Sequence, residues 1–289
     1  MDLTPIILKK KKKIIQSQAV NCQSFKSFEY DKERRNIKIS LDSEIEYLLL
    51  DQENDITDIK CINDANVFMY LYNQKNININ CFKGSNTNIF MINEIDSLDQ
   101  KININLEKDS NLEIYKFDFI KGNLHTNEFI NIIGENSKVE IKRLNFSNEN
   151  QNIEHKINVL HDSIRSTSHY TNFLFAKDSS RIKVDITAKI KEGMYLSNAS
   201  QENRGVLLGK EAVIEVDPKL LIDCDDVLAS HGAAIGTIDP EALYYLMSRG
   251  ITKENSEKLI VGSYFETFYK ALKNDEIKAY LFQLVNAIF

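Results

Sequence analysis

The chain has 289 residues, of which 43% are hydrophobic and 27% are charged, and its formal net charge at pH 7 is −6. This length and composition are enough for a substantial buried core, in one large all-β domain or in two ordinary ones. The negative charge argues against a surface that binds nucleic-acid phosphates, because such domains usually present a basic face. The one basic run, Lys9–Lys13, is local, and we interpret it as a solvated arm.

Neither a membrane protein nor a secreted protein is indicated. No apolar stretch reaches the roughly 18 residues that a spanning helix needs, and the apolar residues Pro5–Leu8 precede the lysines, the reverse of a signal peptide. We therefore expect a cytoplasmic protein with no membrane or nucleic-acid partner. The cysteines show no CxxC pair or recurring spacing, so we expect no disulfide framework and no self-contained metal site. They are Cys22, Cys61, Cys81 and Cys224.

Short runs of one pattern recur along the chain. The pattern is small, any, aliphatic, polar, aliphatic, which is the period-2 alternation of a β-strand. The runs are SNLEI at 110–114, SKVEI at 137–141, SRIKV at 180–184 and AVIEV at 212–216, with similar runs around Val67 and Ile89. Their first aliphatic residues are 22, 23, 27, 43 and 32 residues apart, and we interpret the step of 43 as about two coils.

A repeat of this length, built of short strands joined by polar turns, predicts a mainly β fold with a right-handed parallel β-helix-like core. We expect an N-terminal arm at 1–35, the β-helix core at 36–237 and a C-terminal helical domain at 238–289. Glycine and proline are few, so we expect asparagine to make many of the turns. A β-sandwich is the alternative, but it would show turns every 8–12 residues and no register between distant strands.

After Asp239 the sequence pattern becomes helical. Asp239 is suited to cap a helix, Pro240 to its first position, and Gly250 to a left-handed stop, which predicts a short helix over 240–249. Thr252 is expected to cap a second helix that reaches about Leu272. A third helix is expected from Asp275, where apolar residues repeat at helical spacing.

His231 stands out in the segment ASHGAAIGTID at 229–239, because its neighbours are almost all small or aliphatic. An imidazole with so little cover can donate or accept a proton or ligate a metal ion at neutral pH. The alternative is a histidine that is merely hydrogen-bonded within a turn. Cys224, seven residues earlier, is expected on a strand with its side chain toward the core. His155 and His161 are six residues apart, which places them on one strand face, and we interpret them as stacked surface residues.

The stretch HGAAIGTIDPEALYYLMSRGI at 231–251, preceded by NRGVLLGKEAVIEVDPKLLIDCDDVLAS, resembles the C-terminal region of the SufB/SufD family of iron–sulfur cluster assembly proteins. The resemblance covers roughly residues 150–289. SufB-type members carry Glu where this chain has Gly232, and Cys where it has Arg204-Gly205, so the resemblance is to the SufD-like branch in a short form.

The resemblance implies a non-catalytic scaffold subunit. It would pair with a SufB-like subunit across the β-helix ends and bind a SufC-like ABC ATPase through its C-terminal helices. It would hold no cofactor stably alone, and an iron–sulfur cluster would form transiently near the subunit interface. The implied assembly site comprises His231, which would also be the metal ligand, with Cys224 and Gly232. The implied ATPase contact comprises Tyr264, Phe265, Phe268, Leu281 and Leu284.

Two other functions stay open from the sequence. One is a cluster-carrying SufB-like scaffold that acts as a homodimer. The other is a β-helix polysaccharide lyase or hydrolase, although the acidic residues here occur at turns and not on one strand face.

Overall fold

A computed structural model of the chain describes residues 28–31, 36–41, 46–50, 54–271, 278, 279 and 282. The chain divides into two compact units, with a boundary between Gly236 and Thr237. The unit of residues 27–236 contains the strands, and the other contains helices α2 and α3. The sequence-based boundary stood one residue later, after residue 237.

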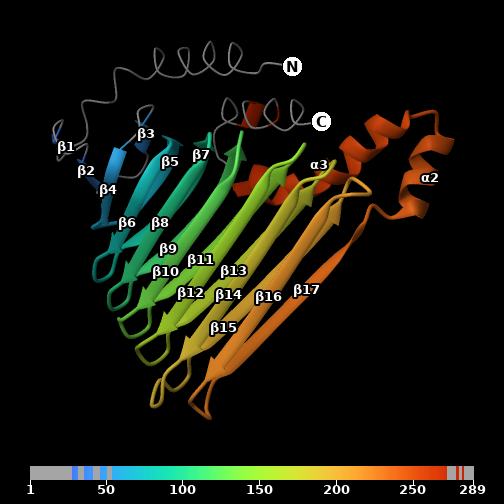
Figure 1. Cartoon of the computed structure of the whole chain (residues 1–289). Helices are drawn as coiled ribbons and strands as arrows, with labels where there is room; N and C mark the ends of the chain where they lie inside the picture. The colour runs from blue at the N-terminus through green and yellow to red at the C-terminus, as the bar shows by residue number, and fades with distance from the viewer. Residues whose placement is uncertain are drawn as a thin grey trace. The chain divides into compact units, whose positions relative to one another are not determined.

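The strands form two sheets, and from β2 onward successive strands alternate between them (Figure 1). The first sheet contains β1 (Phe28–Asp31), β2 (Asn36–Leu41), β4 (Asn54–Cys61), β6 (Gln74–Cys81), β8 (Leu98–Leu106), β10 (Leu124–Ile132), β12 (Asn152–His161), β14 (Arg181–Ile190) and β16 (Val213–Ile222). The second contains β3 (Glu46–Leu50), β5 (Ala65–Tyr72), β7 (Asn86–Ile95), β9 (Asn111–Ile120), β11 (Lys138–Ser147), β13 (Thr167–Ala176), β15 (Asn198–Leu207) and β17 (Leu228–Thr237).

Each coil of the chain contributes one strand to each sheet, which makes the unit a parallel β-solenoid. Neighbouring strands are parallel from β2 to β16 in the first sheet and from β3 to β15 in the second. Within these described runs and the strand before them, only β1 and β2 pair antiparallel. Parallel strands need a long crossover between neighbours, which the strand of the opposite sheet supplies here. The predicted β-helix-like core is confirmed, and the β-sandwich alternative is wrong.

The register confirms most of the predicted repeat and corrects one step. Val67 pairs with Ile89 and Leu112 with Val139, as the steps of 22 and 27 predicted. Ile89, however, pairs with Ile114, so Leu112 lies two residues out of register with it. The step of 43 from Val139 to Ile182 is not two coils, because these residues lie in different sheets. The repeated pattern therefore marks strands of both sheets.

The turns before the strands of the second sheet explain the small residue in the repeated pattern. Ser110, Ser137 and Ser166 are buried, and each donates its hydroxyl to the carbonyl of the residue three positions earlier, at 2.6–2.9 Å. Such local bonds favour a turn and satisfy the backbone where a strand begins. Asparagine makes only some of the left-handed turns, and the non-glycine residues with positive φ are Asn73, Asp109, Asn136, Glu149, Arg165, Asp178 and Leu196.

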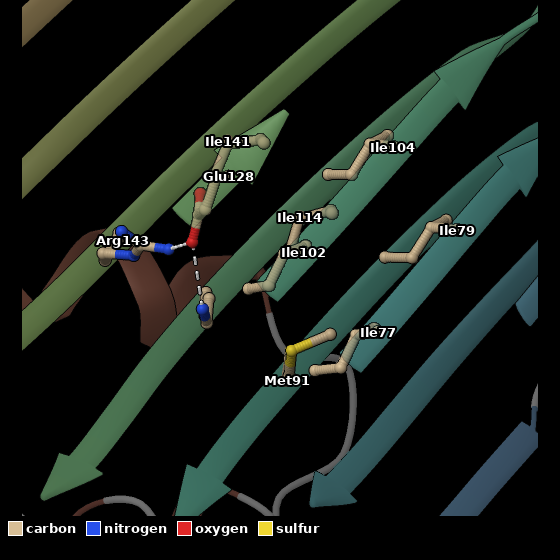
Figure 2. Close-up of a pocket in the computed structure, with 10 residues that line it drawn as sticks. Ile77, Ile79, Met91, Ile102, Ile104, Ile114, Glu128, Ile141 and Arg143 are labelled. Atoms are coloured by element: carbon tan, nitrogen blue, oxygen red, sulfur yellow. Dashed lines mark hydrogen bonds and ion pairs between the residues drawn. The ribbon is translucent and has the colours of Figure 1, made fainter. Parts of the chain in front are cut away.

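The solenoid interior is mainly apolar, but it also holds buried polar side chains and a buried charged cluster. Lys116 and Arg143 are register neighbours in the second sheet, and both face Glu128 of the first sheet. Lys116 Nζ lies 3.4 Å from Glu128 and 3.5 Å from Asp118, whose other oxygen lies 3.3 Å from Arg143 Nε. Figure 2 shows Glu128 directed at Arg143 beside a layer of isoleucines. Two basic side chains thus face two acidic ones, the pairing that buried ionisable groups require.

The helices of the second unit begin where the sequence predicted. In α2 (Pro240–Ser248) Asp239 accepts from the backbone N–H of Glu241 at 3.0 Å, and Gly250 beyond its end has φ +86°. In α3 (Lys253–Ala271) the hydroxyl of Thr252 accepts from the N–H of Asn255. The predicted third helix lies almost wholly outside the described residues. Among the described helices, none is both long and apolar enough to cross a bilayer.

Candidate functional site

His231 lies in β17, the last strand of the second sheet. The N–H of Leu228 donates to the carbonyl of Ser197. The first residues of β9, β11, β13 and β15 make the same contact with the residue before their register partner, so Leu228 pairs with Asn198. His231 consequently occupies the position next to Gln201. The hydroxyls of Ser230 and Ser200, 3.3 Å apart, agree with this register.

Strand alternation decides which way the imidazole points. Gln201 and Gly205 face the interior and are buried, so their register neighbours His231 and Ile235 belong to the inward face as well. A Cβ built on Gly205 would lie 3.1 Å from the Ile235 side chain, which confirms that Ile235 stacks on it. His231 therefore stands at the end of an inward row that continues through Gln201 to Tyr170.

The last coil is open. All ten residues of β17 are exposed, and the inward residues of β16 beyond Ile214 are only half-buried. No described strand pairs with the outer edge of β17. A Cβ added at Gly232 or Gly236 would meet no atom within 4 Å. The small side chains around His231 thus leave both the imidazole and the strand edge accessible.

Two buried amides hold β17 against the body of the solenoid. Asn172 Nδ2 donates to Asn203 Oδ1 at 2.8 Å, and Asn203 Nδ2 donates to the carbonyl of Gly232 at 3.2 Å. The backbone beside His231 is therefore fixed by side chains of the two preceding coils. This pair was missed from the sequence, because the sequence alone does not show which residues of this strand face the interior.

Cys224 does not lie on a strand facing the core, as the sequence suggested. β16 ends at Ile222, and Cys224 is half-buried in the connection to β17 with a free thiol. No group of three or more His, Cys, Asp or Glu side chains suited to a metal ion occurs in the part of the chain that the structure describes. His231 is thus a single accessible imidazole that can supply one ligand or carry one proton.

His155 and His161 share one face of β12, as predicted, but that face is the interior and not the surface. His155 lies between Thr126 and Asn145, and burial lowers its pKa well below the ordinary value. His161 lies between the hydroxyls of Ser166 and Ser168 at 2.7 and 2.8 Å, and burial lowers its pKa to about 4. Both imidazoles are therefore neutral core groups at pH 7.

The residues predicted for the ATPase contact are only partly at the surface. Tyr264 is half-buried, and Phe265 and Phe268 are fully buried in α3. Leu281 and Leu284 lie outside the described residues. Buried side chains present no surface in this conformation, so a contact through them stays a prediction. The large apolar side chains exposed on the described helices are Tyr244, Tyr245, Met247 and Leu259, and Phe282 beyond α3 is exposed as well.

Comparison with known proteins bears on this arrangement. A family model described as SUF system FeS cluster assembly, SufBD core domain, matches residues 48–264. The iron-sulfur cluster assembly protein SufD of Bacillus subtilis (strain 168) is 33% identical over 158 residues, which is 55% of this chain and 36% of that protein. SufD of Escherichia coli (strain K12) is 27% identical over 155 residues, 54% of this chain and 37% of that protein.

A plant relative matches over a similar length. Protein ABCI7, chloroplastic, of Arabidopsis thaliana is 26% identical over 153 residues, 53% of this chain and 32% of that protein. In each of these three matches the aligned part of the chain spans about a third of the relative's own length.

Proposed function

The chain belongs to the SufBD core family, with SufD-like sequence, and from this premise we propose that it is a scaffold subunit of a Suf iron–sulfur cluster assembly complex. In this proposal it catalyses no reaction of its own. A SufB-like subunit pairs with it along β17, and an iron–sulfur cluster is built at the junction as cargo. The chain alone holds no cluster stably. We further propose that it acts in the cytoplasm.

The observation that carries this proposal is the open edge of β17. An unpaired, exposed strand edge is a template for pairing with another chain, and proteins normally cover or blunt it. Here the strand Leu228–Thr237 contains no charged side chain and no proline that would prevent such pairing. A strand added at this edge would run directly beside His231. Main-chain hydrogen bonds would supply affinity, as in other complexes formed by strand addition.

The edge can be tested at a single backbone N–H. Leu228 donates its N–H toward β15, so the N–H groups of alternate residues, including Ala233, point to the free edge. Ala233→Pro removes one edge donor without removing a bond to β15, and proline is tolerated at such edge positions. Ala233→Val is the matched control, because it adds bulk but keeps the donor.

The measurement is co-purification of each variant with a co-expressed SufB-like subunit, together with the melting temperature of the isolated chain. We expect Ala233→Pro to melt near the wild-type temperature and to lose the partner, while Ala233→Val retains it. A folded Ala233→Pro chain that binds as tightly as wild type would contradict pairing through this edge. If the chain forms stable homodimers and does not bind the SufB-like subunit, the homodimeric alternative is favoured.

For the ATPase we propose a contact on the exposed face of α2. Tyr244, Tyr245 and Met247 are exposed together there, and a contiguous apolar patch on a globular protein usually marks an interaction site. Arg249 lies over the Tyr245 ring, 5.3 Å from its centre. Replacing Tyr244 and Met247 by serine should abolish co-purification with a SufC-like ATPase. Replacing the exposed Glu241 by glutamine serves as the control, and unchanged binding by the double variant would refute the contact.

A further inference from the structure

Gln201 is buried directly beneath His231 and has an unsatisfied polar atom. Its side-chain Nε2 donates to the carbonyl of Lys219 on β16 at 3.2 Å, so the amide spans the interior of the last closed coil. Its Oε1 is buried and has no hydrogen-bond partner among the described residues. Buried polar atoms are nearly always paired, so such an exception requires an explanation.

The orientation of the Gln201 amide follows from its partner. A carbonyl oxygen only accepts, so the Lys219 carbonyl requires the NH₂ group of the amide, and Oε1 must point elsewhere. An amide flip would bring two oxygens together and is excluded by the same contact. Oε1 is thus a hydrogen-bond acceptor with a fixed direction, and no donor among the described residues bonds to it.

The neighbouring donors on the second sheet are already engaged. Tyr170, the register neighbour on the preceding coil, donates its hydroxyl to Glu128 at 2.8 Å. Asn203, two residues along β15, donates to the carbonyl of Gly232. The register neighbour on the other side is His231, on a strand about 4.8 Å away. Its ring nitrogens have no hydrogen-bond partner in the part of the chain that the structure describes, and its side chain belongs to the same inward face.

We propose that Gln201 is the positioning residue of His231, with Gln201 Oε1 accepting a hydrogen bond from one ring N–H of the imidazole. This bond would select one tautomer and leave the second ring nitrogen with its lone pair toward the open end of the solenoid. Histidines that ligate metals are commonly oriented in this way by an acceptor on the other nitrogen. The purpose of the orientation rests on the proposed function, whereas the bond itself does not.

Two substitutions separate this bond from the contact with Lys219. Gln201→Met and Gln201→Glu both lose the Nε2 donor to the Lys219 carbonyl. Only Gln201→Glu keeps an oxygen that can accept from His231. A difference between the two variants therefore reports on the acceptor and not on the cross-coil bond. Ser200→Ala, a change on the outward face next to Gln201, is the control for general disturbance of β15.

The readout is the tautomer of His231 in the full-length chain at pH 8, from long-range proton–nitrogen NMR of ¹⁵N-histidine-labelled protein. His231→Asn assigns the signals. In wild type, Ser200→Ala and Gln201→Glu we expect one ring nitrogen of N–H type and one with a free lone pair. In Gln201→Met we expect averaged nitrogen shifts, because neither tautomer is held.

Averaged shifts in wild type would overturn the proposal, and so would a Gln201→Met spectrum identical to wild type or equal changes in both Gln201 variants. If Gln201→Met does not fold, wild type and Gln201→Glu still decide.

The NMR result is independent of cluster assembly. If one tautomer is held but His231→Ala assembles clusters normally, the proposed function is refuted and the positioning role stands. If the tautomers are averaged but His231→Ala fails to assemble clusters, the positioning role is refuted and the proposed function stands.

Discussion

Asn203 holds the last strand of the solenoid through the main chain of Gly232, with its Nδ2 3.2 Å from the Gly232 carbonyl oxygen. The same amide accepts from Asn172 through its oxygen. One buried side chain therefore links three consecutive coils at the position next to His231. This link adds to the backbone hydrogen bonds between β17 and β15, and β17 has no described partner strand on its outer side.

Replacing Asn203 by alanine should loosen β17. The Asn172 amide and the Gly232 carbonyl would lose a partner, and we expect the free energy of unfolding to fall by about 1–3 kcal/mol. Urea unfolding measures this loss, and hydrogen exchange should accelerate at the N–H groups of β17. Glu202→Ala, on the exposed side of the same strand, should change stability by no more than about 0.5 kcal/mol. Equal effects of the two substitutions would show that the amide link is unimportant.

Acid should destabilise the solenoid through His161. Burial lowers its folded-state pKa from 6.5 to about 4, so between these values the unfolded chain binds more protons than the folded one. Stability should therefore fall as the pH falls from about 6.5 to about 4, with a contribution of about 3 kcal/mol from this group.

His161→Gln cannot titrate and should flatten this part of the stability profile, as measured by urea unfolding at several pH values. His155, whose pKa is lowered in the same direction, should retain a part of the slope. His125→Gln is the matched control, because that side chain is about half exposed. An unchanged slope in His161→Gln would mean that His161 does not stay neutral in the folded protein.

Lys116 should give a second pH dependence, on the alkaline side. Burial, followed by the neighbouring Arg143 guanidinium, lowers its pKa from 10.5 to about 7. The unfolded chain therefore binds more protons between these values, and the contribution of Lys116 to stability should rise as the pH rises from about 7 to about 10.5. Lys116→Met should remove that rise, whereas Lys156→Met, at an exposed position of β12, should leave it. Identical profiles for wild type and Lys116→Met would refute this.

The stacking of coils could be predicted from the sequence because each strand repeats the same alternation and the same preceding small residue. The step from Val139 to Ile182 was misread because that alternation looks alike in both sheets, and spacing alone does not say which sheet a strand joins. The charged interior was missed for a related reason. Lys116 and Glu128 stand 12 residues apart on different strands, and only their placement on opposite sheets brings them together.

The position of the candidate site was predicted in part. His231 and Gly232 were identified from local composition and from the resemblance, and the structure places both on an accessible strand. Cys224 was wrongly predicted to lie on a strand. The alternating pattern of the sequence continues beyond Ile222, whereas strand β16 ends at that residue. Gln201 and Asn203 were missed because their significance depends on a register with β17 that one sequence does not display.

The central claim is that His231 serves assembly and not folding, and His231→Ala tests it most directly in a strain deleted for this gene. Because the imidazole is exposed, we expect a change in stability of no more than about 0.5 kcal/mol and normal co-purification with the SufB-like and SufC-like partners. Cluster assembly should fall by about tenfold or more, as for other lost metal-site groups, while Ser230→Ala assembles normally. Full complementation by His231→Ala, or a loss of activity that merely follows a loss of stability, would contradict the account.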